Sequence, residues 1–156
     1  THDIANKKKT DKVDAKILAD LLRTGYLPEV YIPTEDILNL RDLCRHKASL
    51  TRERVQFQNK IKSRLLLLGI KYPAKLWNKK NLNWLASLDD PILDNLLTVR
   101  ESIAKEENDT LRRVEKISRS HRLASLLRST PGIAEFGALM ILSEIADIKR
   151  FKTPKE

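Results

Sequence analysis

The stretch "LRDLCRHKASLTRERVQFQNKIKSRLLLLGI", residues 40–70, decides the fold because apolar residues recur in it at heptad spacing. The a positions hold Leu40, Ile61 and Leu68, and the d positions hold Leu43, Leu50 and Phe57. Three basic residues, Lys47, Arg54 and Arg64, interrupt this seam. The pattern predicts one long helix that Thr34 caps and that ends at Gly69.

A second long helix is predicted to begin at "DDP", residues 89–91, with Asp90 as its cap and Pro91 at the first helical position. Its apolar residues recur at threes, fours and sevens, and the recurring positions are Leu96, Ile103, Val114, Ile117 and Ala124. Polar residues interrupt the series at Arg100, Glu107, Thr110 and His121. This helix is expected to continue to about residue 128.

Residues 71–90, "KYPAKLWNKKNLNWLASLDD", read as a connector with short helical turns, which Trp77 and Trp84 pin to the neighbouring helices. Two long helices joined in this way most simply form an antiparallel hairpin, each helix about 50 Å long at ~1.5 Å per residue. Symmetric folding would place Arg54 near Glu106 and Glu107. Such a pair could set the register of the seam, or the long basic side chains could extend to solvent, and the sequence leaves both open.

Near the N-terminus, "KKKTDKVDAKILADLL", residues 7–22, predicts a helix over 10–24 that Gly25 ends. Asp11 and Asp14 lie on one face of its first turn, where two carboxylates can share Mg²⁺. Acidic residues are also common there because the helix dipole favours them, so the spacing alone does not assign a metal site. Asp20 lies outside the pair. Residues 25–34, "GYLPEVYIPT", contain two prolines and predict an extended linker.

Residues 126–151, "LLRSTPGIAEFGALMILSEIADIKRF", predict a helix that ends near Ser129, a tight turn, and an apolar helix from Phe136 to about Ile145. The segment resembles a helix-hairpin-helix, in which a Pro-Gly turn such as that at Gly132 offers backbone N–H groups to a phosphate. Ala134 stands where that motif usually has its second glycine, so plain helix packing through a tight turn is an equal alternative.

Composition predicts a mainly α-helical protein with an anionic partner, nucleic acid before membrane. The formal net charge is +9, one third of residues are charged and only 5% are aromatic. Residues 41–64 hold eight Lys or Arg against two acids, and residues 112–128 hold six against one. Charge runs can also be plain solvated faces. The candidate nucleic-acid contacts are Lys8, Lys9, Lys12, Arg52, Lys60, Lys62, Arg113, Lys116, Arg119 and Gly132.

The longest apolar run, "LLLLGI", is too short to span a membrane, and Cys44 is the single cysteine. Both features fit a cytoplasmic protein. The three histidines are scattered without cysteine partners, which argues against a zinc site. Because the chain starts at Thr1 and stops soon after a helical segment, we expect a fragment of a longer protein.

The blocks "KTDKVDAKILADLL", "GYLPEVYIP", the heptad stretch and "TPGIAEFGALMILSEIADIKRF" together resemble the Piv/MooV-type insertion-sequence transposases, DEDD transposases with a RuvC-like domain. The resemblance covers essentially the whole chain. It implies that Asp11 and Asp14 match the last two acidic residues of the family's Mg²⁺ site and are catalytic, whereas the first Asp and the Glu lie upstream of Thr1. The family's nucleophilic serine lies downstream, and Ser143 does not match it.

The resemblance further implies three parts. Residues 1–33 are the C-terminal end of a RuvC-like α/β nuclease domain with its linker, residues 34–128 are the helical hairpin or coiled coil, and residues 129–156 begin the C-terminal transposase domain. The parent protein would bind, cut and rejoin DNA, assemble as a homo-oligomer through the coiled coil and in many members use a guide RNA. The fragment alone would be inactive. The alternative is a non-catalytic basic helical module for nucleic-acid binding or dimerisation.

Overall fold

The computed structural model describes residues 10–27 and 30–151, and in these residues the regular structure is helical, with no strand. The prediction of a mainly α-helical chain is therefore confirmed for this part. The chain divides after Ile32 into two units, which we describe separately.

The first unit contains α1 (Asp11–Thr24), which begins after Thr10 and ends at Gly25 as predicted. Gly25 adopts a φ of 72°, and the N–H group of the next residue, Tyr26, donates to the carbonyl of Leu21 at 3.0 Å. This left-handed turn favours glycine, which explains the stop. No residue of α1 is buried, and the apolar side chains of its predicted stripe are largely exposed.

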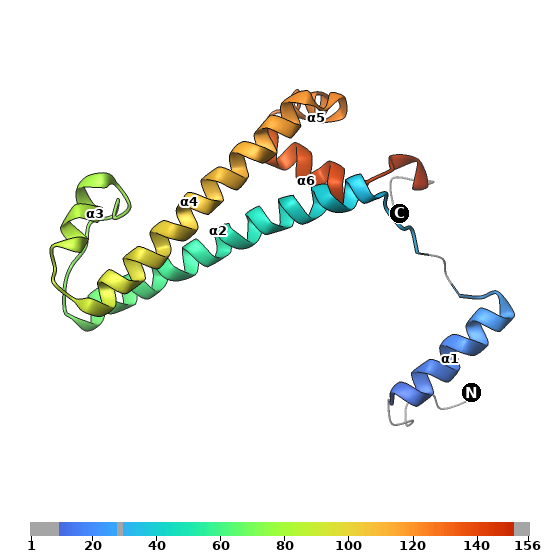
Figure 1. The fold of residues 1–156 in the computed structure, drawn as a ribbon, viewed down its shortest axis with the longest axis horizontal. Helices are drawn as coiled ribbons and strands as arrows, with labels where there is room; N and C mark the ends of the chain where they lie inside the picture. The colour runs from blue at the N-terminus through green and yellow to red at the C-terminus, as the bar shows by residue number, and fades with distance from the viewer. Residues whose placement is uncertain (1–9, 28–29, 152–156) are drawn as a thin grey trace. The chain divides into compact units, whose positions relative to one another are not determined.

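The second unit is built on two long helices, α2 (Glu35–Leu67) and α4 (Pro91–Ser120), which pack side by side in opposite directions (Figure 1). Their connector carries α3 (Lys79–Ala86) at one end of the pair. Asp90 caps α4 as predicted, because its side chain accepts from the Leu93 N–H at 2.7 Å. Arg64, near the end of α2, binds the same carboxylate at 2.5 Å, which joins the two helices beside the connector.

The remaining helices lie at the other end of the pair (Figure 1). They are α5 (Arg122–Arg128), α6 (Glu135–Ile145) and the short 3₁₀ helix η1 (Ile148–Arg150). The second long helix was expected to run without a break to residue 128, and this was wrong. Backbone angles at His121 are extended, and its Nδ1 accepts from the Ala124 N–H at 3.4 Å, so His121 caps a new helix.

Two apolar clusters hold the second unit together, one at each end of the helix pair. The cluster beside the connector contains the wholly or almost wholly buried Ile61, Leu65, Leu76, Leu85 and Leu93, with Trp77 and Trp84 packed against it. The cluster at the other end contains Cys44, Val114 and Leu139. The prediction that the two tryptophans attach the connector to its neighbours is confirmed.

The heptad assignment located the covered face of α2 only in part. Leu50 and Ile61 are buried as expected, but Leu68 lies at the end of the helix and is 41% exposed. Gln58 and Leu65, which the heptad did not select, are buried. The reason is that a straight helix has 3.6 residues per turn, so its buried face moves relative to a strict repeat of seven.

Candidate functional site

The two aspartates proposed as metal ligands lie in the first turn of α1. Asp11 is exposed and Asp14 is half-buried, and their spacing of three residues places them on neighbouring parts of one helix surface. Lys12, which lies between them in the sequence, is exposed, whereas Lys8 and Lys9 lie outside the described residues. No group of three or more potential metal-ligating side chains occurs within residues 10–27 and 30–151. Two carboxylates can supply oxygen ligands for Mg²⁺, but they form only part of a coordination shell.

A polar cluster occupies the middle of the helix pair, between the two apolar clusters. Glu107 of α4 is 8% exposed and accepts from Arg54 Nε at 2.5 Å and from Thr51 Oγ1 at 2.8 Å, with Lys47 Nζ 3.6 Å away. Burial raises the pKa of Glu107, but the hydrogen bonds from Arg54 and Thr51 and the two nearby cations outweigh it, so the pKa is lower than usual. The expected contact of Arg54 with Glu107 is therefore present, and Arg54 does not simply extend into water.

The basic side chains of α2 fall into two groups. Those that face other helices are paired with carboxylates: Arg41 and Arg45 with Glu144, Lys47 and Arg54 with Glu107, and Arg64 with Asp90. The three that sequence reasoning nominated for nucleic acid, Arg52, Lys60 and Lys62, form no ion pair in the part of the chain that the structure describes. Their positive charge is therefore not neutralised by a carboxylate of this unit.

The three residues of α4 that were nominated for nucleic-acid contact differ in whether a carboxylate lies near them. Arg113 and Lys116 are exposed and form no ion pair over the described ranges. Arg119 is near two carboxylates, that of Glu115 at 3.4 Å and that of Glu135 at 3.6 Å. Its charge is partly neutralised, so Arg119 is the weaker candidate for contact with a phosphate.

The turn proposed for phosphate binding places Gly132 at a φ of 88°, a conformation that favours glycine. The following N–H group, of Ile133, donates to the Thr130 carbonyl at 3.2 Å and is already used. Glu135 begins α6, and its own backbone N–H and then Arg119 and Arg128 lower the pKa of its carboxyl group. A carboxylate thus already lies at the end of α6 where a phosphate would bind, and the role of Gly132 stays a prediction.

Sequence reasoning missed the contact between α2 and the C-terminal end of α6. Arg41 donates from Nε to the Ser143 carbonyl at 3.0 Å, and both oxygens of Glu144 accept from Arg45, at 2.7 and 2.8 Å. Arg41 thereby satisfies a carbonyl that a helix end leaves without a partner. The partners are about a hundred residues apart in the sequence, so no local signal could have shown the pairing. Ser143 itself is buried, as expected for a packing residue.

The described part of the chain contains no helix long and apolar enough to cross a membrane. Comparison with known families gives two matches. Residues 2–70 match a DEDD transposase family of the IS110 type, described as "Transposase", and residues 124–156 match the "Transposase IS116/IS110/IS902 family".

Among curated proteins, the chain is 29% identical over 157 aligned positions to "Putative transposase y4qE" of Sinorhizobium fredii (strain NBRC 101917 / NGR234). The alignment includes 97% of this chain but only 38% of that protein. No solved structure matches the chain. Asp11 and Asp14 lie within the first family match, and the Pro-Gly turn lies within the second. The chain is therefore similar at both of its ends to transposases of the IS110 type.

Proposed function

We propose that the protein to which this chain belongs binds, cuts and rejoins DNA during transposition of an insertion sequence. The observation that carries the proposal is the order of the two transposase matches. The first holds the aspartate pair and the basic helix α2, and the second holds the Pro-Gly turn, with α4 between the two matches. Because the chain spans about 38% of its relative, the remaining residues of the reaction would come from other parts of the protein.

Asp11 and Asp14 would hold Mg²⁺ together with carboxylates of a RuvC-like domain. When bound, Mg²⁺ ions in a nuclease activate the attacking oxygen and stabilise the leaving one. The fit rests on chemistry and accessibility, since both side chains are carboxylates in the first turn of a helix and neither is buried. Two carboxylates alone hold Mg²⁺ weakly, so we expect this chain by itself to be inactive.

The second unit would hold nucleic acid, both the DNA and a guide RNA, and would also join copies of the protein. Arg52, Lys60 and Lys62 support the first role, because their charges are left without carboxylate partners within the described part of α2 and its neighbours. Contacts of this kind bind phosphate without reading bases. The exposed apolar residues Leu66 and Leu67 at the end of α2 support the second role, since an oligomer could cover them.

The experiment that tests the metal role uses the full-length protein with Asp11→Asn or Asp14→Asn. Each change should abolish DNA cleavage and leave nucleic-acid binding nearly intact, because a neutral amide lacks the charge that holds the ion while phosphate binding is unaffected. Asp20→Asn is the matched control, since Asp20 lies on the same helix and its carboxylate pairs with exposed Arg23, at 3.6 Å. Cleavage at the native rate by both variants would refute the assignment.

A further inference from the structure

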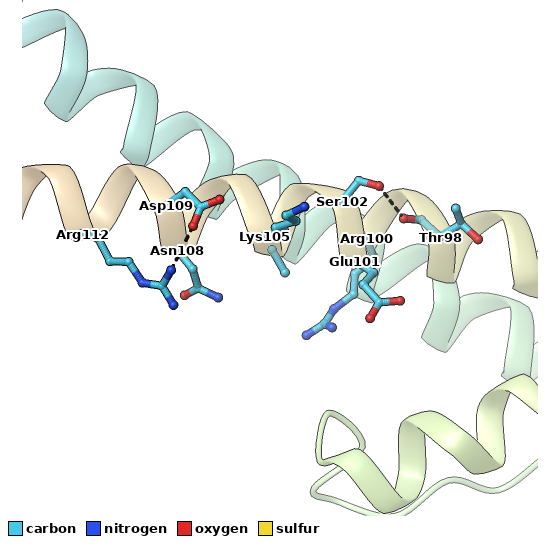
Figure 2. Close-up of a pocket in the computed structure, with 9 residues that line it drawn as sticks. Thr98, Arg100, Glu101, Ser102, Lys105, Asn108, Asp109 and Arg112 are labelled. Atoms are coloured by element: carbon cyan, nitrogen blue, oxygen red, sulfur yellow. Dashed lines mark hydrogen bonds and ion pairs between the residues drawn. The ribbon is translucent and has the colours of Figure 1, made fainter.

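A hollow of about 730 Å³ runs along one side of α4, and basic, acidic and amide side chains border it. In Figure 2, Arg100, Glu101, Asn108 and Arg112 extend to the same side of α4. A second hollow of about 380 Å³ lies between α3 and α4, where Lys79 joins Arg100 and Glu101. Arg100 and Glu101 border both hollows, so the two are neighbours and share one arginine.

Arg100 is the unusual residue of this region, because its guanidinium has no carboxylate partner in the described ranges. Its Nε atom is buried and has no hydrogen-bond acceptor there. The guanidinium lies over the ring of Trp77, 5.2 Å from its centre. Glu101 and Glu107 are near enough to act on Arg100 by their charge, but neither forms an ion pair with it, and Glu107 is bound by Arg54 and approached by Lys47.

The charge of Arg100 therefore lacks a bound counter-ion. Burial, followed by the positive charge of Arg54, lowers the pKa of Arg100. A guanidinium nevertheless stays protonated in proteins, so it cannot escape the cost by losing its proton. A partly buried cation without a partner is unfavourable, and a bound anion would remove that cost. The hollows beside Arg100 are where such an anion can approach.

We propose that Arg100, Lys105, Asn108 and Arg112, with Lys79 of α3, form a binding site for the phosphate groups of a nucleic-acid backbone. This proposal rests on the proposed function for the choice of nucleic acid as the ligand. Planar guanidinium groups bind phosphate through paired N–H donors, and the amide of Asn108 adds a neutral donor. From Arg100 to Arg112 the helix rises about 18 Å. This length matches about five phosphates of one strand of a duplex, which follow one another at ~3.4 Å along the duplex axis.

This site, which we call the Arg100 site, is separate from the unpaired cations described above. Arg113 and Lys116 border neither hollow. Asp109 borders the first hollow and pairs with Arg112 at 3.2 Å, so the charge of Arg112 is partly neutralised and Arg112 is the weaker of the two arginines. Glu101 borders both hollows and would repel a phosphate there. Glu101 and Arg100 should therefore act on anion affinity in opposite directions. Removing the Glu101 charge should strengthen anion binding, whereas removing the Arg100 charge should weaken it.

Trp77 supplies the measurement, since the guanidinium that would bind the anion lies over its ring. In the 156-residue chain carrying Trp84→Phe, Trp77 is the single tryptophan. Titration with short inorganic polyphosphate, which does not absorb in the near ultraviolet, should change Trp77 fluorescence to saturation. Arg100→Gln should weaken binding about tenfold or more, the loss expected for hydrogen bonds to a charged group. Arg100→Lys should give an intermediate affinity, and Glu101→Gln should raise the affinity.

The control is Arg122→Gln, which removes one exposed positive charge from α5 outside both hollows and should leave the Trp77 response unchanged. Circular dichroism checks that each variant is folded, and if Arg100→Gln is unfolded, Arg100→Lys and Glu101→Gln provide the test. Equal binding by all variants would overturn the site. A response to polyglutamate but not to a single-stranded oligonucleotide would overturn the choice of nucleic acid. Either outcome is independent of the DNA cleavage assay that tests the aspartates.

Discussion

Replacing Glu107 with glutamine should destabilise the second unit more than any other charge-removing change in the seam between α2 and α4. Glutamine keeps the size of the side chain and can still accept the hydrogen bond from Thr51. It leaves Arg54 and Lys47 without their counter-ion, and these side chains are only 26% and 15% exposed. The cost comes from buried positive charge, and packing is preserved.

The magnitude follows from the burial of the three side chains. Removing one partner of a buried ion pair costs about 3–5 kcal/mol. Because Arg54 keeps part of its surface in water, we expect the lower end, ~3 kcal/mol of the free energy of unfolding. For a domain of this size that corresponds to a fall in Tm of roughly 12 °C, at ~4 °C per kcal/mol.

The destabilisation caused by Glu107→Gln should depend on pH, and the lowered pKa of Glu107 determines the direction of that dependence. A carboxyl group with a lowered pKa contributes stability above its unfolded value of about 4.3 and loses it as the pH falls through the folded value. The difference between the native chain and Glu107→Gln should therefore be complete at neutral pH and should shrink as the pH falls below the unfolded value of about 4.3.

Urea unfolding followed by far-UV circular dichroism measures both quantities. Glu106→Gln is the control, because Glu106 is the exposed neighbour of Glu107, and the change should alter the free energy of unfolding by less than about 0.5 kcal/mol. A destabilisation below about 0.5 kcal/mol for Glu107→Gln at neutral pH would refute the reasoning. A destabilisation that is equally large at acidic pH would show that packing, and not charge, is responsible.

Two further predictions concern the same helices. Ile61→Ala should cost about 2–5 kcal/mol because Ile61 is fully buried, whereas Phe57→Ala should cost less, about 1–2 kcal/mol, because Phe57 is half-buried with Lys60 over its ring. A larger destabilisation in urea for Phe57→Ala than for Ile61→Ala would show that the ring is covered in an assembly. Removing the charges of Arg52, Lys60 and Lys62 together should weaken nucleic-acid binding by the full-length protein and flatten the log–log salt dependence by ~0.9 for each phosphate that the protein no longer neutralises. The same test on the second long helix uses Arg113, Lys116 and Arg119, with the smallest effect expected for Arg119. Unchanged affinity and slope for DNA and RNA after both sets of changes would leave the helix pair as an assembly device.

The sequence by itself determined the helical elements and most of their ends. Asp90 and Pro91 marked the start of α4, and Gly25 and the Gly69 region marked the ends of α1 and α2, because caps and left-handed turns depend on the residue at one position. It also selected Asp11 and Asp14 and the basic residues as candidates, since the residue type alone carries their chemistry. The break at His121 escaped the pattern because the apolar spacing continues past it into α5.

Only the tertiary structure decided which charges are free. Arg52 and Arg54 stand two residues apart in one basic run, yet Arg54 is bound by Glu107 and Arg52 has no such partner in the described ranges. The difference depends on which face of α2 meets α4, and on a helix of 3.6 residues per turn that face cannot be fixed from a heptad pattern with polar interruptions. Arg100 shows the same limit. In the sequence it only interrupts an apolar series, whereas its unsatisfied Nε and its place over Trp77 arise from the packing of α4 against the connector.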